Sequence, residues 1–140
     1  MICAPHFWAS ACVLAALFAV QLTASFAQQP TIGNATNTKN QVSSIGRTTR
    51  QISKGTDVHS NEVVRTGNAS IADLKFLDDS TMNLGPITEI RLDKFVYDPS
   101  GSAGSFVIEA TRGALRFVTG KQDHNSYQIK TPFGTLGIRG

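Results

Sequence analysis

The sequence predicts an all-β domain of short strands. From Ile52 onward, apolar residues recur at every second position, as they do in strands with one buried face. Turn-forming pairs such as Gly85-Pro86 and Asp98-Pro99 separate these alternating runs. Beyond residue 27, no segment shows the 3.6-residue apolar spacing of an amphipathic helix. These three observations together favour strands over helices throughout the domain.

The alternating positions place the expected strands in order along the chain. The first clear pattern is Ala72, Leu74 and Phe76. It is followed by Met82 and Leu84, Ile90 and Leu92, Phe106 to Ala110, Leu115 and Phe117, Tyr127 and Ile129, and Leu136 and Ile138. The segments between them are rich in Asp, Gly, Pro and Ser, which supply turn conformations.

Three of these apolar pairs recur at a step of eight residues, namely Leu74/Phe76, Met82/Leu84 and Ile90/Leu92. A strand of about five residues with a short corner would stack each pair on the one before. The step fits either a β-meander or the stacked coils of a β-solenoid-like domain. We favour stacked coils, because no Asn-Gly hairpin turn separates these strands.

Residues 1–27 are expected to form a cleaved signal peptide. Their apolar stretch, Ala9 to Val20, is about twelve residues long, shorter than the roughly 20 that span a bilayer. Ser25 and Ala27 give the small-x-small pattern before a cleavage site, which predicts a mature chain that begins at Gln28. The leader lacks Lys and Arg, so a retained membrane anchor is the alternative. We expect a periplasmic or secreted bacterial protein with no permanent membrane span.

Residues 28–51 are expected to be a polar, flexible lead-in, and residues 52–140 the β-domain. The lead-in contains no aromatic residue and only isolated apolar ones, so it buries too little surface to offset its ordering entropy. Within it, the segment from Val42 to Ile52 has enough apolar residues to add an edge strand.

Charge and cysteine content exclude several classes of function. The net charge of +3 comes from scattered residues, whereas nucleic-acid binding needs a Lys/Arg patch. Both cysteines, Cys3 and Cys12, lie in the leader, so the mature chain has no disulfide, thiol nucleophile or cysteine metal site. We expect no cofactor.

Several segments resemble the FecR-type periplasmic domain family. Residues 55–58 (Gly-Thr-Asp-Val) and 62–67 (Glu-Val-Val-Arg-Thr-Gly) are similar to its opening motif, and 69–86 to its strand, Asp-Gly-Ser turn and following strand. Residues 112–117 (Arg-Gly-Ala-Leu-Arg-Phe) and 129–140 match two later blocks. The resemblance covers roughly residues 53–140 and implies a β-solenoid-like fold, a periplasmic location and contact with another protein.

The sequence departs from the family pattern at two places. Asp79 stands where the family usually has Gly, so this turn must accommodate a side chain. The sequence also stops at Gly140, inside the final motif, which implies either an open sheet edge or a truncated gene model. Regulatory family members carry an anti-sigma segment and a membrane helix before the domain, so their relay of an iron-transport signal is not carried over here.

The sequence offers no convincing catalytic or metal site. Asp57 and His59 would share one strand face, and Asp123 precedes His124, but both pairs lie in polar segments where solvated side chains are expected. Asp78 and Asp79 are assigned to a turn. No serine lies in a nucleophile elbow, and no glycine-rich phosphate loop is present. A hydrolase is therefore not expected.

We expect a non-catalytic module that binds another envelope protein, with strand addition as a physically reasonable mode. The candidate contact residues are Arg116, Ile138, Arg139 and Gly140, although solvation or ion pairing also explains the arginines. The alternative is a small-ligand or cell-wall glycan binding module. That function would use exposed aromatic residues, for which the candidates are Phe95, Tyr97, Tyr127 and Phe133, the last expected to pack.

Overall fold

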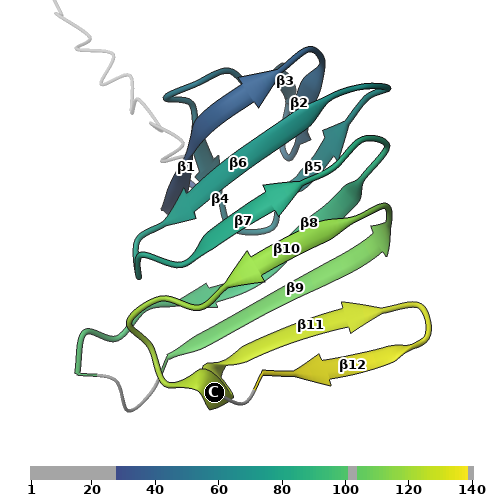
Figure 1. Ribbon diagram of the computed structural model, residues 1–140. Coiled ribbons are helices and arrows are strands. Elements are labelled where there is room, and N and C mark those ends of the chain that lie inside the picture. The colour runs from purple at the N-terminus through teal and green to yellow at the C-terminus, as the bar shows by residue number, and fades with distance from the viewer. Residues whose placement is uncertain (1–27, 101–103, 139–140) are drawn as a thin grey trace, which may run out of the picture.

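The computed structural model describes residues 28–100 and 104–138, which form two packed β-sheets (Figure 1). The five-stranded sheet contains, in spatial order, β10 (Leu115–Val118), β7 (Thr81–Leu84), β6 (Ile71–Phe76), β1 (Thr31–Lys39) and β4 (Asp57–His59). The seven-stranded sheet contains β12 (Gly134–Gly137), β11 (Tyr127–Thr131), β9 (Ser105–Arg112), β8 (Glu89–Val96), β5 (Val63–Thr66), β2 (Val42–Ile45) and β3 (Thr49–Gln51). The predicted all-β class is confirmed.

The described residues contain a single short 3₁₀ helix, η1 (His124–Ser126), and no helix long and apolar enough to cross a membrane. The expected signal peptide, residues 1–27, lies outside the described residues, as do Arg139 and Gly140.

The chain alternates between the two sheets, and the three apolar pairs of the eight-residue repeat are not stacked as coils, contrary to the arrangement that we favoured. β6 and β7 form an antiparallel hairpin in which Leu74 faces Met82, so this part of the eight-residue repeat is a meander. The next pair, Ile90 and Leu92, lies in β8 of the other sheet. Farther along, β9, β10 and β11 make one coil of chain, because β11 returns parallel to β9 with Ile129 beside Ile108.

The core lies between the sheets and contains the apolar residues that alternation marked. An aromatic cluster occupies its end near β10. The ring of Phe106 lies 4.7 Å from that of Phe76, 4.9 Å from that of Phe95 and 5.7 Å from that of Phe117. Phe117 also contacts Tyr127, at 5.3 Å between ring centres. Because β10 carries Phe117, this strand packs over β9 and β11.

The expectation of a flexible lead-in at residues 28–51 is wrong for residues 31–51, which form three strands. β1 lies inside its sheet between β6 and β4, and its Ile32 and Ala35 are 2% and 0% exposed. Its polar residues remain on the outer face, where Thr36 and Asn37 hydrogen-bond to Asp73 at 3.1 Å. A strand with one solvated face therefore needs few apolar residues.

Small residues also allow β1 to pack closely against β6. A Cβ atom at Gly33 would lie 2.4 Å from the carbonyl oxygen of Lys75, so only glycine fits at this contact. The expected edge strand between Val42 and Ile52 is confirmed by β3, which is the outermost strand of the seven-stranded sheet.

Ile32→Ala should lower the free energy of unfolding by about 2–5 kcal/mol, because it leaves a cavity among buried side chains. The matched control is Ile71→Ala in neighbouring β6, where the side chain is 37% exposed and the loss should stay below about 1 kcal/mol. Chemical denaturation of both variants checks this. Equal stabilities would show that β1 does not contribute to the folded core.

Candidate functional site

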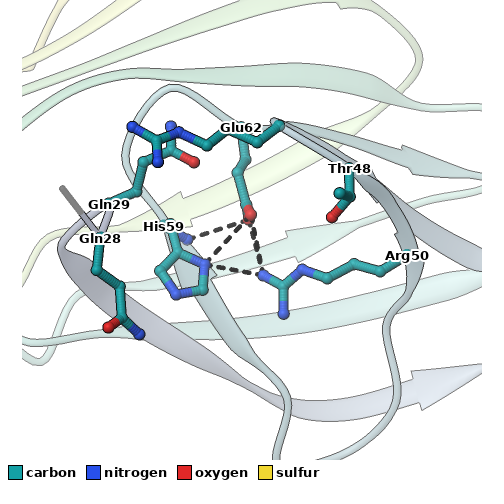
Figure 2. Close-up of a pocket in the computed structure, with 7 residues that line it drawn as sticks. Gln28, Gln29, Thr48, Arg50, His59 and Glu62 are labelled. Atoms are coloured by element: carbon teal, nitrogen blue, oxygen red, sulfur yellow. Dashed lines mark hydrogen bonds and ion pairs between the residues drawn. The ribbon is translucent and has the colours of Figure 1, made fainter. Parts of the chain in front are cut away.

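A polar surface pocket of about 440 Å³ lies near β3, β4 and the turn that follows β4 (Figure 2). Its lining residues are Gln28, Gln29, Arg47, Thr48, Arg50, His59 and Glu62. Figure 2 shows the side chains of Arg50 and His59 converging on the carboxylate of Glu62. Of the two histidines considered in the sequence, His59 and His124, only His59 contacts an acidic side chain among the described residues.

Arg50 holds the cluster together through one guanidinium nitrogen. Its Nη2 atom lies 3.0 Å from each carboxylate oxygen of Glu62, 2.9 Å from Nδ1 of His59 and 2.6 Å from the carbonyl oxygen of Asp57. Nδ1 of His59 also lies 3.2 Å from Glu62 Oε1. An unprotonated Nδ1 accepts from Arg50, whereas a protonated Nδ1 donates to Glu62.

Hydrogen bonds determine the charge state of Glu62. Burial disfavours the carboxylate, but the backbone N–H of His59 and the guanidinium of Arg50 outweigh that effect and lower the pKa of Glu62 below its ordinary value. Glu62 is therefore ionised at neutral pH and forms a charge-assisted contact with Arg50.

The cluster links a strand of one sheet to a strand of the other. The Asp57 side chain takes no part in the cluster, and the acidic side chain in contact with His59 is that of Glu62. Within residues 28–100 and 104–138, no three His, Cys, Asp or Glu side chains are placed to hold a metal ion. Arg50 in β3 and His59 in β4 belong to different sheets, so their shared contact with Glu62 ties the two sheet edges together.

A second polar network surrounds the carboxylate of Asp78, which is 0% exposed. Its Oδ1 atom accepts hydrogen bonds from the backbone N–H and the hydroxyl of Ser80, at 3.0 and 2.5 Å. Its Oδ2 atom accepts from the side-chain amide of Gln122 at 3.0 Å and from the hydroxyl of Tyr127 at 2.7 Å. These four donor groups, from three residues, satisfy both oxygens of the buried carboxyl group.

The network connects the β6–β7 turn to the segment between β10 and β11. The backbone N–H of Lys121 donates to the carbonyl oxygen of Asp78 at 2.7 Å, and that of Gly120 donates to the Tyr127 hydroxyl at 3.0 Å. A Cβ atom at Gly120 would lie 2.1 Å from the Asp78 carbonyl oxygen. Only glycine allows the chain to approach this closely.

The remaining sequence-predicted polar sites have structural roles. Asp79 has a φ of 64°, as expected for a turn position that usually holds glycine. Its carboxylate contacts the ammonium groups of Lys121 and Lys75, which lower the pKa of Asp79. Asp123 accepts a hydrogen bond from the Asn125 backbone at the start of η1, and His124 is exposed.

The sandwich is open at the end formed by β10, β11 and β12. In the register of the seven-stranded sheet, Leu92, Ile108, Ile129 and Leu136 form one row across β8, β9, β11 and β12. Their exposed fractions are 0%, 1%, 9% and 60%. These four side chains lie on the same face of the sheet, the one that faces the five-stranded sheet. The increase in exposed fraction therefore means that the five-stranded sheet does not extend over β12. Figure 1 shows β11 and β12 extending beyond β10.

The strand at the edge of that cover is β10, and one side of it has no neighbouring strand among the described residues. The Gly85 N–H donates to the Ala114 carbonyl at 2.9 Å, which identifies this facing pair as hydrogen-bonded. Hydrogen-bonded and non-bonded pairs alternate along an antiparallel ladder. Arg116 therefore directs its main-chain groups to β7, whereas Leu115 and Phe117 direct theirs to the free side.

The structure brings together two of the four candidate contact residues at this end. Arg116 is exposed on β10 and forms no ion pair with a described acidic side chain. Ile138 follows β12 and packs against the core, and its backbone N–H approaches the Tyr127 carbonyl at 3.5 Å. We call the free side of β10 and the inner-face side chains of Ile129, Leu136 and Ile138 the open end.

Of the four aromatic candidates for glycan binding, two lie in the core and a third lies in the turn between β11 and β12. Tyr127 is 1% exposed, and Phe95 belongs to the aromatic core cluster. Phe133, which was expected to pack, is fully exposed in the turn between β11 and β12. That expectation is wrong because a two-residue turn at the tip of a hairpin has no second layer to cover it.

Sequence reasoning missed both polar networks. The partners of Asp78, Gln122 and Tyr127, follow it by 44 and 49 residues, so only its turn contacts were visible locally. A tyrosine at a core-facing position was the available signal, because a buried hydroxyl needs a partner. Arg50 lies in the segment expected to be flexible, and nothing in the sequence pattern connects it to Glu62.

The hydroxyl group of Tyr127 should lose its proton only at unusually high pH. Burial first, and then its hydrogen bond to Asp78, raise the pKa of Tyr127 to about 12. In a Tyr97→Phe variant, Tyr127 is the remaining tyrosine of the two in the sequence, so tyrosinate absorbance reports it alone. Because the folded pKa exceeds the unfolded one, the neutral hydroxyl stabilises the fold fully below about pH 10. This stability is lost as the pH rises towards 12. A midpoint near 10 in the folded protein would contradict the network.

Glu62→Gln should lower the free energy of unfolding at neutral pH by about 1–3 kcal/mol, because it weakens a charge-assisted contact. The lowered pKa of Glu62 means that its stabilisation is present above its ordinary pKa and is lost as the pH falls through the lower folded value. The variant should therefore lose less stability on acidification than the wild type. The control is Glu89→Gln, whose more exposed carboxylate pairs with Arg65 at 2.7 Å. Parallel pH profiles for wild type and Glu62→Gln would contradict this assignment.

The comparisons with known proteins agree with the resemblance in the sequence. The family model FecR, described as FecR protein, matches residues 62–140, which is more than half of the chain. Neither curated proteins nor solved structures gave a match. The family is linked to the periplasm and to signalling, and it is not known for enzymatic activity. On the strength of the matched residues, the chain belongs to the FecR family.

Proposed function

We propose that this chain is an exported, non-catalytic module that binds another protein of the bacterial envelope, in signalling or assembly. Family membership supports a signalling-related role. The composition of residues 1–27, with an apolar stretch and a small-x-small end, supports export with cleavage before Gln28. The two polar networks join strands and loops of the fold, so neither leaves a nucleophile and base in position to react.

The single observation that carries the proposal is the open end. A two-sheet sandwich buries its inner faces, yet Leu136 on the inner face of β12 is 60% exposed. Phe133 in the adjoining turn is fully exposed. Apolar side chains that gather at one end of a small domain are typical of a protein contact.

The contact is proposed to include the four residues named from the sequence. Arg116 lies on the free strand β10, and Ile138 borders the inner face of β12. Arg139 and Gly140 continue the chain directly from Ile138 and are included on that ground. Glycan binding is not proposed, because two of the aromatic side chains that it would use, Phe95 and Tyr127, pack in the core.

The test is site-specific photocrosslinking in the source bacterium. A photoreactive residue at Leu136 should give one discrete adduct with an envelope protein, because this side chain lies on the proposed contact. The matched control is the same residue at Gln51, which is exposed in β3 at the opposite edge of the same sheet. Excess unlabelled wild-type chain should compete the Leu136 adduct away. Equal adducts at both positions, or none at Leu136, would contradict the proposal.

A further inference from the structure

The free side of β10 presents backbone N–H and C=O groups that no strand of the described residues pairs with. Leu115 and Phe117 direct their N–H and C=O groups away from β7, as the Ala114–Gly85 hydrogen bond requires. Unpaired groups of this kind form a template for one more strand. The same two side chains are half-buried and face the core, whereas Arg116 and Val118 face solvent.

A strand added beside β10 would lie over the inner face of β11 and β12, where the Leu136 side chain is 60% exposed. Neighbouring strands are about 4.8 Å apart and packed sheets about 10 Å apart, so the added strand would sit above β11 and β12. There it would cover Ile129, Leu136 and Ile138, which lie on the inner face beyond β10. Its inward side chains must therefore be apolar, at alternate positions.

A second copy of this chain does not fit the same place. If two β10 strands paired edge to edge, the five-stranded sheets would continue into one another. Each copy, however, carries β11 and β12 beyond its own β10. The long sheets of the two copies would then overlap at β11 and β12. The longer sheet thus blocks self-pairing through β10 and leaves room for a single strand only.

The outward side chain of Arg116 favours an acidic residue at the facing position of the added strand. Arg116 is exposed and forms no ion pair with a described acidic residue. It is hydrogen-bonded to β7, so on the free side it would occupy a non-bonded pair, in which facing side chains lie closest. A carboxylate there would pair with the guanidinium, whereas a lysine or arginine would be repelled.

We propose that the open end binds one extended segment of a partner protein with an apolar–acidic–apolar sequence, which adds beside β10 as a sixth strand of the five-stranded sheet. The proposal rests on the proposed function and specifies the chemistry of the partner. The acidic residue faces Arg116, and the two apolar residues face the core beside Leu115 and Phe117. Main-chain hydrogen bonds supply affinity, and the alternating side chains supply specificity.

The test uses ¹⁵N-labelled protein and short capped peptides as probes. The peptide Ser-Thr-Val-Glu-Val-Thr-Ser should shift the amide signals of Leu115 and Phe117, because these groups become hydrogen-bonded. The same peptide with Lys in place of Glu should bind about tenfold more weakly. Arg116→Glu should reverse this preference. The matched control, Arg47→Glu, makes the same charge change at an exposed arginine in the distant polar pocket and should leave the preference unchanged.

Four results would overturn the proposal. Three concern the peptides: an absence of shifts in β10 at millimolar peptide, the largest shifts at β3 or β4, and equal binding of the two peptides. The fourth is a dimer paired through β10, because the strand overhang would then not block self-association. Photocrosslinking at Leu136 in cells is independent of these measurements. A specific adduct without peptide binding would retain the proposed function and reject strand addition at β10.

Discussion

The hydrogen bond between the Tyr127 hydroxyl and the Asp78 carboxylate is the contact on which the last part of the fold depends. It joins the start of β11 to the β6–β7 turn, and so fixes how the chain returns from the five-stranded sheet. Ser80 and Gln122 complete the set of donors, so both oxygens of the buried Asp78 carboxyl group accept hydrogen bonds. With Tyr127 held there, β11 runs parallel to β9, and its hairpin partner β12 lies beyond the cover of β10.

The unequal sizes of the two sheets follow from that return path. β11 and its hairpin partner β12 add two strands to one sheet, whereas β10 adds a single strand to the other. The aromatic cluster closes the core as far as Phe117 and Tyr127, where the two sheets still face one another. Beyond these rings the inner face of β12 has no cover from the described residues. The open end is therefore a consequence of strand order and not of a local irregularity.

Sequence patterns predicted the parts of this fold in which alternation is strong. They located the core positions of β6 to β8 and the domain class, because burial on one strand face leaves a period of two. They failed at β1, whose buried face has one large apolar residue, Ile32, beside the small Gly33 and Ala35. This composition does not mark a strand, and only the tertiary contact with β6 reveals it. Neither polar network could be predicted, because burial and pairing of charges depend on contacts across the sheets. For the candidate site, sequence named Arg116 and Ile138 but gave no reason why they should lie at the same end.

An exposed strand that binds a partner must be open to pairing with that partner and yet must not pair with other copies of its own chain. The geometry of the open end meets both requirements. A free edge promotes aggregation by pairing with the edge of another copy, and proteins usually limit this risk with short strands and outward charges. β10 has four residues and an outward Arg116, and β12 contains Gly134 and Gly137, which weaken strand pairing. The overhanging hairpin adds a steric barrier that acts on whole domains and spares a single extended segment. Discrimination between self and partner then comes from the shape of the recipient, so the partner segment needs only alternation and one well-placed acid.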